Sequence, residues 1–200
     1  MTISGFAFIA ISSLVAVMEP FSTVAVFVAL ARDMDAAAKK RAIGKSMKIS
    51  LIVLVFFEIT GHLMFQVFNI TVAAFQIAGG ILLITVALGM LNTKKSEFFS
   101  GEGDISIVPL AFPLTAGPGA ITTVVLLTSQ ASGIIESIFV FIAVVIAVLV
   151  SFIALRYSNI LFNGLKDDGL RVVTALMAIV VLAIAVQFII NGILQVIGQM

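Results

Sequence analysis

Two proline-containing segments, Glu19-Pro20 and Gly117-Pro118-Gly119, interrupt long apolar stretches of the chain. Proline lacks the backbone donor of a helix interior and clashes with the preceding turn, so a helix is expected to kink or break there. A helix that starts again at proline presents N–H groups and a partial positive charge, which suit a carboxylate. The segment before the break ends in free carbonyls, which suit Na⁺ or an ammonium group. The alternative is that each proline only produces a kink that helps the helices to pack.

Hydroxyl groups lie beside both prolines and add hydrogen-bonding groups to the candidate site. Two breaks at matching places in opposed spans favour a ligand site over packing alone, because together they would enclose one central position. The predicted substrate-binding residues are Glu19, Pro20, Ser22, Thr23, Thr115, Gly117, Pro118, Gly119, Thr122 and Thr123.

Three ionisable residues within apolar stretches are candidates for coupling or gating. An ionised Glu19 costs at least about 2.5 kcal/mol near the middle of a span, which favours a role as proton carrier or cation ligand. Its alternative role is to cap the helix that begins at Pro20. Glu58 and His62 are four residues apart on one helix face, where they could form a proton relay or an outer gate. A polar pair at the membrane interface explains them equally well.

The elements that would position these residues are membrane-spanning helices. Apolar residues make up 62% of the 200 positions and charged residues 10%, which leaves too little polar surface for a soluble domain. A span needs roughly 20 apolar residues. Six spans are predicted, at about 4–31, 47–68, 71–91, 105–130, 136–157 and 170–198, with spans one and four broken near the midplane.

The basic residues predict the orientation of these spans. All 11 of them fall in the three odd-numbered connections or within two residues of them, which places those connections in the cytoplasm and both termini outside it. Within the first connection, residues 33–45 are expected to form a solvated loop with some helix, and a helix lying in the membrane plane is the alternative. The basic residues are Arg32, Lys39, Lys40, Arg41, Lys45, Lys48, Lys94, Lys95, Arg156, Lys166 and Arg171.

The two halves of the chain, 1–95 and 96–200, are predicted to be inverted three-helix repeats. Three spans per half give the halves opposite orientations, and the sequence at 19–26 is similar to that at 117–124. In the third span, the small residues of Ala78-Gly79-Gly80 are expected to let a neighbouring helix approach closely.

The chain resembles the MarC family of bacterial and archaeal inner-membrane proteins. The resemblance is strongest at residues 109–121, Pro-Leu-Ala-Phe-Pro-Leu-Thr-Ala-Gly-Pro-Gly-Ala-Ile, and extends over all six spans through Glu19-Pro20, residues 78–83, and Arg171, residues 185–187 and Asn191-Gly192. It implies a family long labelled for multiple antibiotic resistance, with members described as transporters of small neutral amino acids. Family members usually have Asn or Asp where this chain has Glu19, Gly where it has Ser22, and Arg where it has Gln76, so substrate and coupling ion can differ.

The sequence therefore predicts an inner-membrane secondary transporter of small neutral amino acids, coupled to H⁺ or Na⁺. The alternatives are an exporter of drugs or other small solutes and a non-transporting membrane protein. An enzyme is not expected, because His62 is the sole histidine, cysteine is absent and no Asp lies within a span. The expected partners are the amino acid and the bilayer. No cofactor, resident metal or nucleic acid is expected, and the sequence does not indicate an oligomeric state.

Overall fold

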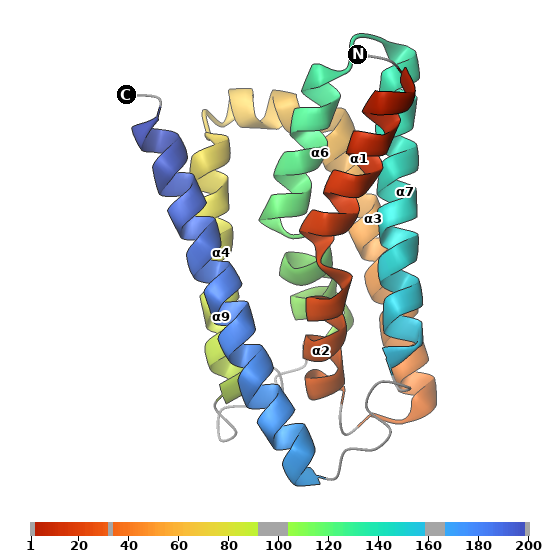
Figure 1. Cartoon of the computed structure of the whole chain (residues 1–200), viewed down its shortest axis with the longest axis vertical. Coiled ribbons are helices and arrows are strands. Elements are labelled where there is room, and N and C mark those ends of the chain that lie inside the picture. The colour runs from red at the N-terminus through yellow and green to blue at the C-terminus, as the bar shows by residue number, and fades with distance from the viewer. Residues whose placement is uncertain (1–2, 32–33, 92–103, 159–166, 199–200) are drawn as a thin grey trace.

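The computed structural model describes residues 3–31, 34–91, 104–158 and 167–198, and this part of the chain is helical without strands (Figure 1). Its elements are α1 (Ile3–Met18), α2 (Pro20–Leu30), α3 (Ala36–Val67), α4 (Val72–Leu91), η1 (Ser106–Thr115), α6 (Pro118–Gln130), α7 (Ile134–Arg156) and α9 (Asp167–Ile197). The expectation of an all-helical chain is confirmed for these residues.

The number of candidate membrane spans agrees with the sequence. Five helical stretches are long and apolar enough to cross a bilayer, and there are six if the bent pair η1 and α6 is one span. Apolar side chains on the outside of the bundle are widely exposed, for example Phe21 at 81% and Ile134 at 81%. Such exposure suits hydrocarbon as the surrounding solvent. The predicted boundaries hold to within a few residues, except in the second span.

The second span starts earlier than predicted, because α3 is already helical at Ala36. The Asp35 side chain caps it by accepting the Ala38 N–H at 2.5 Å. Ala42 and Ser46 are buried, so this part of the helix packs against the bundle. Residues 36–45 are therefore the first turns of α3: the expected helical part is observed, but neither a loop nor a helix separate from the second span forms there. The last turns of α3 cross the opposite end of the molecule to reach α4 (Figure 1).

Basic residues and chain termini lie at opposite ends of the bundle. The start of α3, the end of α7 and the start of α9 lie together at the lower end in Figure 1, whereas α1 begins and α9 finishes at the upper end. The described basic residues lie within the first four turns of α3, the last turn of α7 and the first two turns of α9, and therefore on the side of the lower end. Arg32, Lys94, Lys95 and Lys166 fall outside those ranges.

The helices form two packing groups. One core lies among α1, α3, α6 and α7, and a second joins α4 to α9 and to Val26 of α2. Helices α4 and α9 form the most extensive pair. They approach closely at two glycines, which have no Cβ. A Cβ added to Gly80 would lie 2.6 Å from the Ala185 carbonyl oxygen, and a Cβ added to Gly192 would lie 2.8 Å from the Ala73 carbonyl oxygen. The expected close approach at Gly80 is thus observed, with α9 as the neighbour.

Candidate functional site

The first break is a single residue, Glu19, between α1 and α2. Its backbone is left-handed, with φ 43° and ψ 62°, a conformation that costs a residue other than glycine free energy. The Glu19 carbonyl accepts the Thr23 N–H at 3.2 Å, which starts the ladder of α2. The exposed carboxylate makes no cap hydrogen bond to α2, and its Oε2 accepts the Ser22 hydroxyl at 3.1 Å. The capping role considered from the sequence is therefore not what the side chain does.

The second break spans a longer and more irregular segment. Helix η1 is a π-helix interrupted by extended residues at Val108 and Phe112, and its axis makes a 52° bend with α6. Helix α6 starts at Pro118, after an extended Gly117. A Cβ on Gly117 would lie 2.2 Å from the Pro113 carbonyl oxygen, so only glycine fits there. The whole stretch 115–120 is buried.

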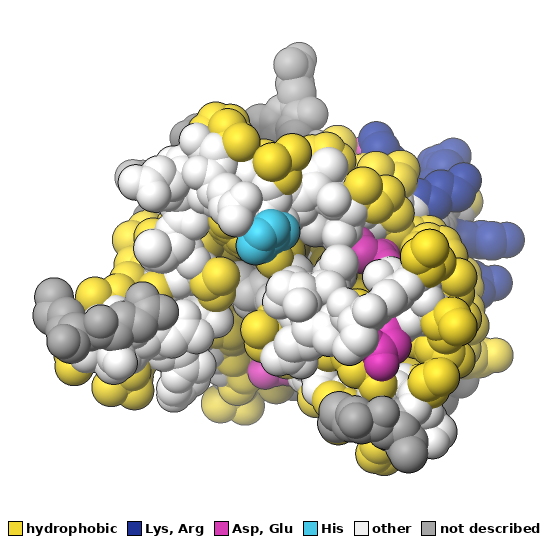
Figure 2. Space-filling model, turned by 90° about the horizontal axis from the view of Figure 1, so that it is seen from above, with side chains coloured by type: hydrophobic (Ala, Val, Ile, Leu, Met, Phe, Trp, Pro, Cys, Tyr) yellow, Lys and Arg dark blue, Asp and Glu magenta, His cyan; other side chains and the backbone are white. Residues whose placement is uncertain are grey.

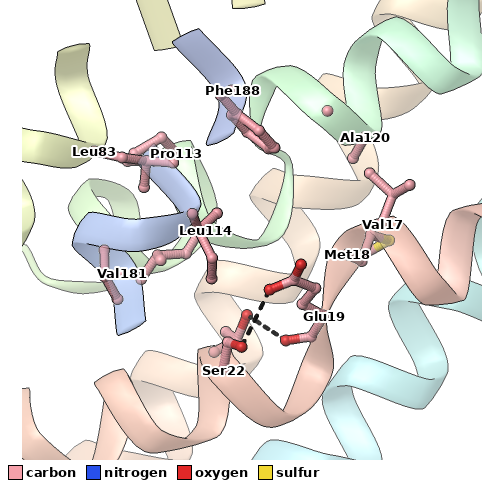
Figure 3. A pocket seen from close by; sticks show the side chains of 14 residues that line it. Val17, Met18, Glu19, Ser22, Leu83, Pro113, Leu114, Ala120, Val181 and Phe188 are labelled. Atoms are coloured by element: carbon pink, nitrogen blue, oxygen red, sulfur yellow. Dashed lines mark hydrogen bonds between the residues drawn. The ribbon is translucent and has the colours of Figure 1, made fainter. Parts of the chain in front are cut away.

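Both breaks line one cavity of about 30 Å³, here called the midplane cavity (Figure 3). The first break contributes Glu19, Ser22 and Thr23. The second contributes Gly117, Gly119 and Ala120, and α4 and α9 supply an apolar wall that includes Leu83, Val181, Ile184 and Phe188. Gly119 and Ala120 lie in the first turn of α6, where backbone N–H groups have no acceptor within the helix. The cavity has room for about one or two water molecules.

The structure brings together only part of the predicted substrate-binding set. Glu19, Ser22, Thr23, Gly117 and Gly119 line the midplane cavity. The two prolines are buried as the first residues of α2 and α6 and do not line it. Thr115 is also buried, and its hydroxyl donates to the Leu110 carbonyl at 2.8 Å.

Thr122 and Thr123 instead line a second, larger hollow, here called the end hollow. Their hydroxyls donate to the Gly119 carbonyl at 3.0 and 2.8 Å. The end hollow measures about 700 Å³ and lies between the last turns of α3 and α9, the first turns of α4, and α6. Figure 2 looks onto this end of the molecule, where the histidine lies on the exposed face.

The two proposed gating residues of α3 are not hydrogen-bonded to each other. His62 lines the end hollow, and its Nε2 lies 3.0 Å from Nε2 of Gln66. Glu58 is half-buried, and its Oε2 has no hydrogen-bond partner among the described residues. A direct Glu58–His62 relay is therefore not formed in this conformation.

Comparison with known proteins identifies the family. The model of the MarC family of integral membrane proteins matches residues 5–197. The chain belongs to the MarC family. A UPF0056 membrane protein of Aquifex aeolicus is 33% identical over 90% of this chain and 88% of its own length. YvbG of Bacillus subtilis is 33% identical over 87% of each chain, and YhcE of Escherichia coli 30% over 90% and 88%. No solved structure matches.

Sequence reasoning missed the α4 and α9 residues of this MarC-family site. Leu83, Val181, Ile184 and Phe188 are ordinary apolar residues of apolar helices, and no local pattern distinguishes them. Gln76 had one signal, since it stands where the family resemblance expects arginine, and it lines the end hollow. Gln187 and Asn191 bond to each other within α9, at 2.7 Å and in an exposed position.

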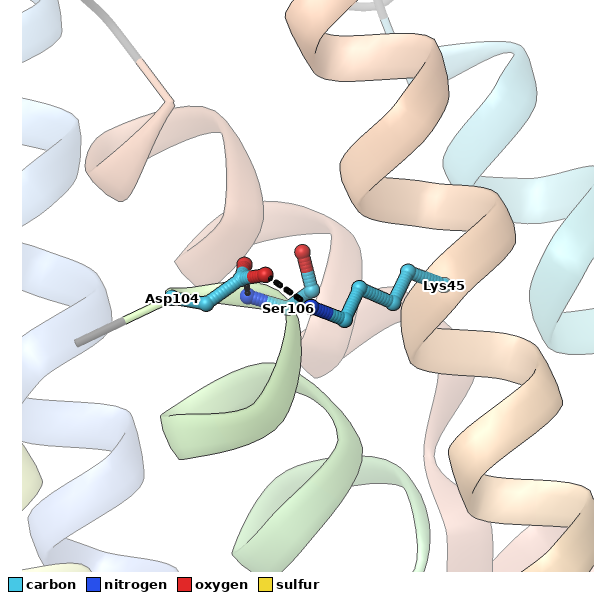
Figure 4. Close-up of polar contacts among 3 residues, drawn as sticks. All are labelled: Lys45, Asp104 and Ser106. Atoms are coloured by element: carbon cyan, nitrogen blue, oxygen red, sulfur yellow. Dashed lines mark hydrogen bonds and ion pairs between the residues drawn. The ribbon is translucent and has the colours of Figure 1, made fainter.

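A polar contact at the basic end of this MarC-family chain joins α3 to the start of the second break (Figure 4). Lys45 Nζ lies 2.6 Å from Asp104 Oδ2, and the Ser106 N–H donates to Asp104 Oδ1 at 2.9 Å. These hydrogen bonds, above all the one from Lys45, lower the pKa of Asp104 to about 2.

The described part of the chain contains no cluster of three His, Asp or Glu residues that could hold a metal ion.

Proposed function

We propose that this protein is a secondary transporter of small neutral amino acids, coupled to H⁺ or Na⁺, with its substrate bound at the midplane cavity. One observation carries the proposal: the first turns of α2 and α6 and the Glu19 carboxylate line the same cavity. Helix starts and a carboxylate offer opposite charges to a solute that carries both.

The lining suits an α-amino acid with a small side chain. The N–H groups of Gly119 and Ala120, at the positive end of α6, would bind the substrate carboxylate. The Glu19 carboxylate would bind the ammonium group, or H⁺ or Na⁺ as the coupling ion. Leu83, Val181 and Phe188 leave no polar partner on the wall formed by α4 and α9, which favours a small apolar side chain.

The helix packing supports two inverted repeats, one over 1–95 and one over 96–200. The third and sixth spans pair as α4 with α9, and the second and fifth pair as α3 with α7. The first span packs on the fifth through α1 and α7, and the fourth packs on the second through α6 and α3. Exchange of the halves leaves this set of neighbours unchanged, as a two-fold axis in the membrane plane requires. Spans one and four would then be broken at equivalent depths.

Alternating access would require motion at the midplane cavity, because about 30 Å³ does not accommodate an amino acid. The α4–α9 pair packs separately from the main core and contacts the second break where a Cβ on Gly79 would meet the Pro118 ring. Movement of this pair against α6 would enlarge the cavity. Among the described residues, no histidine or other general base lines it beside the carboxylate, so we propose transport and not catalysis.

We place the protein in the cell inner membrane with the basic end in the cytoplasm and both termini outside. The positive-inside rule supports this orientation, since the described Lys and Arg residues lie at one end. The chain has no cysteine, so single cysteines report topology directly. An impermeant maleimide should label Ser132→Cys in intact cells and should not label Lys40→Cys, and the reverse result would invert the orientation.

Uptake by proteoliposomes tests the transport function. Purified protein should accumulate labelled glycine or alanine when a pH or Na⁺ gradient is imposed, and the gradient that drives accumulation identifies the coupling ion. Vesicles without protein provide the baseline. Uptake equal to that baseline under both gradients would refute the amino acid proposal.

A further inference from the structure

The end hollow has room for a small solute. Its volume of about 700 Å³ lies within the range of small-molecule sites, roughly 300–1,000 Å³, whereas the midplane cavity of about 30 Å³ lies far below it. A solute that reaches the protein from this end therefore meets the end hollow first.

The lining of the end hollow is polar without formal charge. Four amide side chains line it: Gln66 lies on α3 beside His62, and Asn69, Gln76 and Gln195 come from the α3–α4 turn, α4 and α9. No Asp, Glu, Lys or Arg is among the described residues that line it. A solute with net charge would lose hydration there without gaining a counter-charge. An uncharged solute or a zwitterion carries no such net charge.

Three of these four amides, those of Asn69, Gln76 and Gln195, keep unused hydrogen-bonding capacity. The Thr122, Thr123 and Ser129 hydroxyls already donate to carbonyls of their own helix, and His62 contacts Gln66. Within the described ranges, the Gln76 Oε1 is buried without a partner. A buried amide oxygen without a donor is unfavourable, and a ligand that supplies an N–H or O–H relieves it.

The end hollow and the midplane cavity follow each other along the same helices. On α6, Thr122 and Thr123 line the hollow, and Gly119 and Ala120, one turn before them, line the cavity. Phe188 packs over the boundary, since a Cβ on Gly119 would lie 2.9 Å from its Cζ. Figure 3 shows the Phe188 ring directed towards the cavity.

We propose that the end hollow is a second binding site, outside the midplane cavity, for small neutral amino acids. The ammonium group donates to Gln76 Oε1, and the side-chain amides of Asn69 and Gln195 donate to the carboxylate. The choice of an amino acid among neutral polar solutes rests on the proposed transport function. Binding in the hollow precedes passage to the midplane cavity past Phe188.

A single tryptophan tests this proposal, because the chain contains none. Leu126 lines the hollow and is 56% exposed, so Leu126→Trp places a reporter there with little effect on the core. Its fluorescence in nanodiscs should change saturably with alanine. Three control solutes should bind at least tenfold more weakly than alanine: uncharged glycerol, negatively charged acetate and positively charged methylammonium.

Glutamine-to-leucine variants distinguish a loss of binding in the end hollow from a general effect of the substitution on the protein. In the Leu126→Trp background, Gln76→Leu should weaken alanine binding about tenfold or more. Gln195→Leu, at an exposed position that does not support the fold, should weaken it several-fold. Gln187→Leu is the matched control, since Gln187 lies on α9 outside the hollow, and it should leave the affinity unchanged.

The fluorescence test of the end-hollow site can succeed or fail independently of the uptake experiment that tests the transport function. Alanine binding that depends on Gln76 or Gln195 supports the end-hollow site even if no uptake occurs. No saturable change with alanine, in this reporter and in a second one at Val72→Trp, would overturn it even if uptake is observed. Equal affinity in the Gln76, Gln195 and Gln187 variants would overturn it as well.

Discussion

The two helix breaks differ in how they are made. The first is one exposed, charged residue in a left-handed conformation, and α1 and α2 together still form one apolar stretch, Ile3–Val28. The second occupies a buried, uncharged segment in which η1 and α6 meet at a 52° bend. Neighbouring atoms leave no room for a side chain at Gly117. The first break therefore contributes a charged side chain to the midplane cavity, and the second contributes a closely packed bend and free backbone N–H groups.

Because of this difference, substitutions at the first break should affect function, and substitutions at the second break should affect stability. A change of charge at Glu19 should alter function at little cost to the fold, because no cap hydrogen bond and no burial depend on the carboxylate. A change of volume beside Pro118 should destabilise the fold, because its surroundings are closely packed.

The largest effect is expected for Gly79→Ala, which tests the packing of the second break. The new Cβ would lie 1.7 Å from Pro118 Cγ and 2.6 Å from its Cβ, so α4 must move away from α6. Such overpacking should lower the free energy of unfolding by about 1–3 kcal/mol. Thermal unfolding in detergent, followed by circular dichroism, measures the change.

Gly44→Ala in α3 is the matched control, because no side chain or neighbouring helix lies within 4 Å of the added Cβ. Alanine exceeds glycine in helix propensity by about 1 kcal/mol, so this variant should be as stable as the parent or more so. If both variants unfold at the same temperature, the second break does not depend on close packing.

Glu19→Gln tests the charge of the first break. Glutamine keeps the size of the side chain and can still accept the Ser22 hydroxyl, so the unfolding temperature should stay close to that of the parent. Gradient-driven alanine uptake should fall at least tenfold, because the ammonium group or coupling ion loses its carboxylate.

Glu136→Gln serves as the control for Glu19→Gln. Glu136 accepts the Ser132 N–H in the first turn of α7 and does not line the midplane cavity. This variant should retain uptake. Unchanged gradient-driven uptake in Glu19→Gln would show that the first break, like the second, is structural.

The smallest effect is expected for Asp104→Asn, at the ion pair that leads into the second break. The folded-state pKa of Asp104, about 2, lies below its ordinary value, so the pair stabilises the fold at neutral pH. That contribution is lost as pH falls from about 4 to about 2. Because both side chains are exposed, it should amount to less than about 1 kcal/mol.

Unfolding temperatures at low and high salt check this prediction. The difference between parent and Asp104→Asn should shrink at 1 M salt, where exposed charges are screened. A large difference that persists in salt would mean that the start of η1 depends on Asp104 in another way, for example through the Ser106 N–H.

Most of the fold followed from hydropathy and charge, whereas the site followed only in part. Apolar length predicted five of the six span positions, because every backbone group in a bilayer must be bonded within its own helix. It misplaced the start of the second span, since the Ala-rich stretch after Asp35 contains lysines and resembles a loop. Packing of Ala42 and Ser46 extends the helix there.

The sequence by itself determined that Glu19-Pro20 and Gly117-Pro118-Gly119 interrupt helices, because proline cannot continue a hydrogen-bond ladder whatever surrounds it. Only the tertiary structure decided which side chains share a cavity. In the structure, Ser22 and Thr23 line the midplane cavity together with Gly119. The Thr115 hydroxyl donates within its own helix, and Thr122 and Thr123 line the end hollow. Contacts between helices distant in sequence, such as Phe188 over Gly119, depend on how whole spans pack, and no local pattern records that.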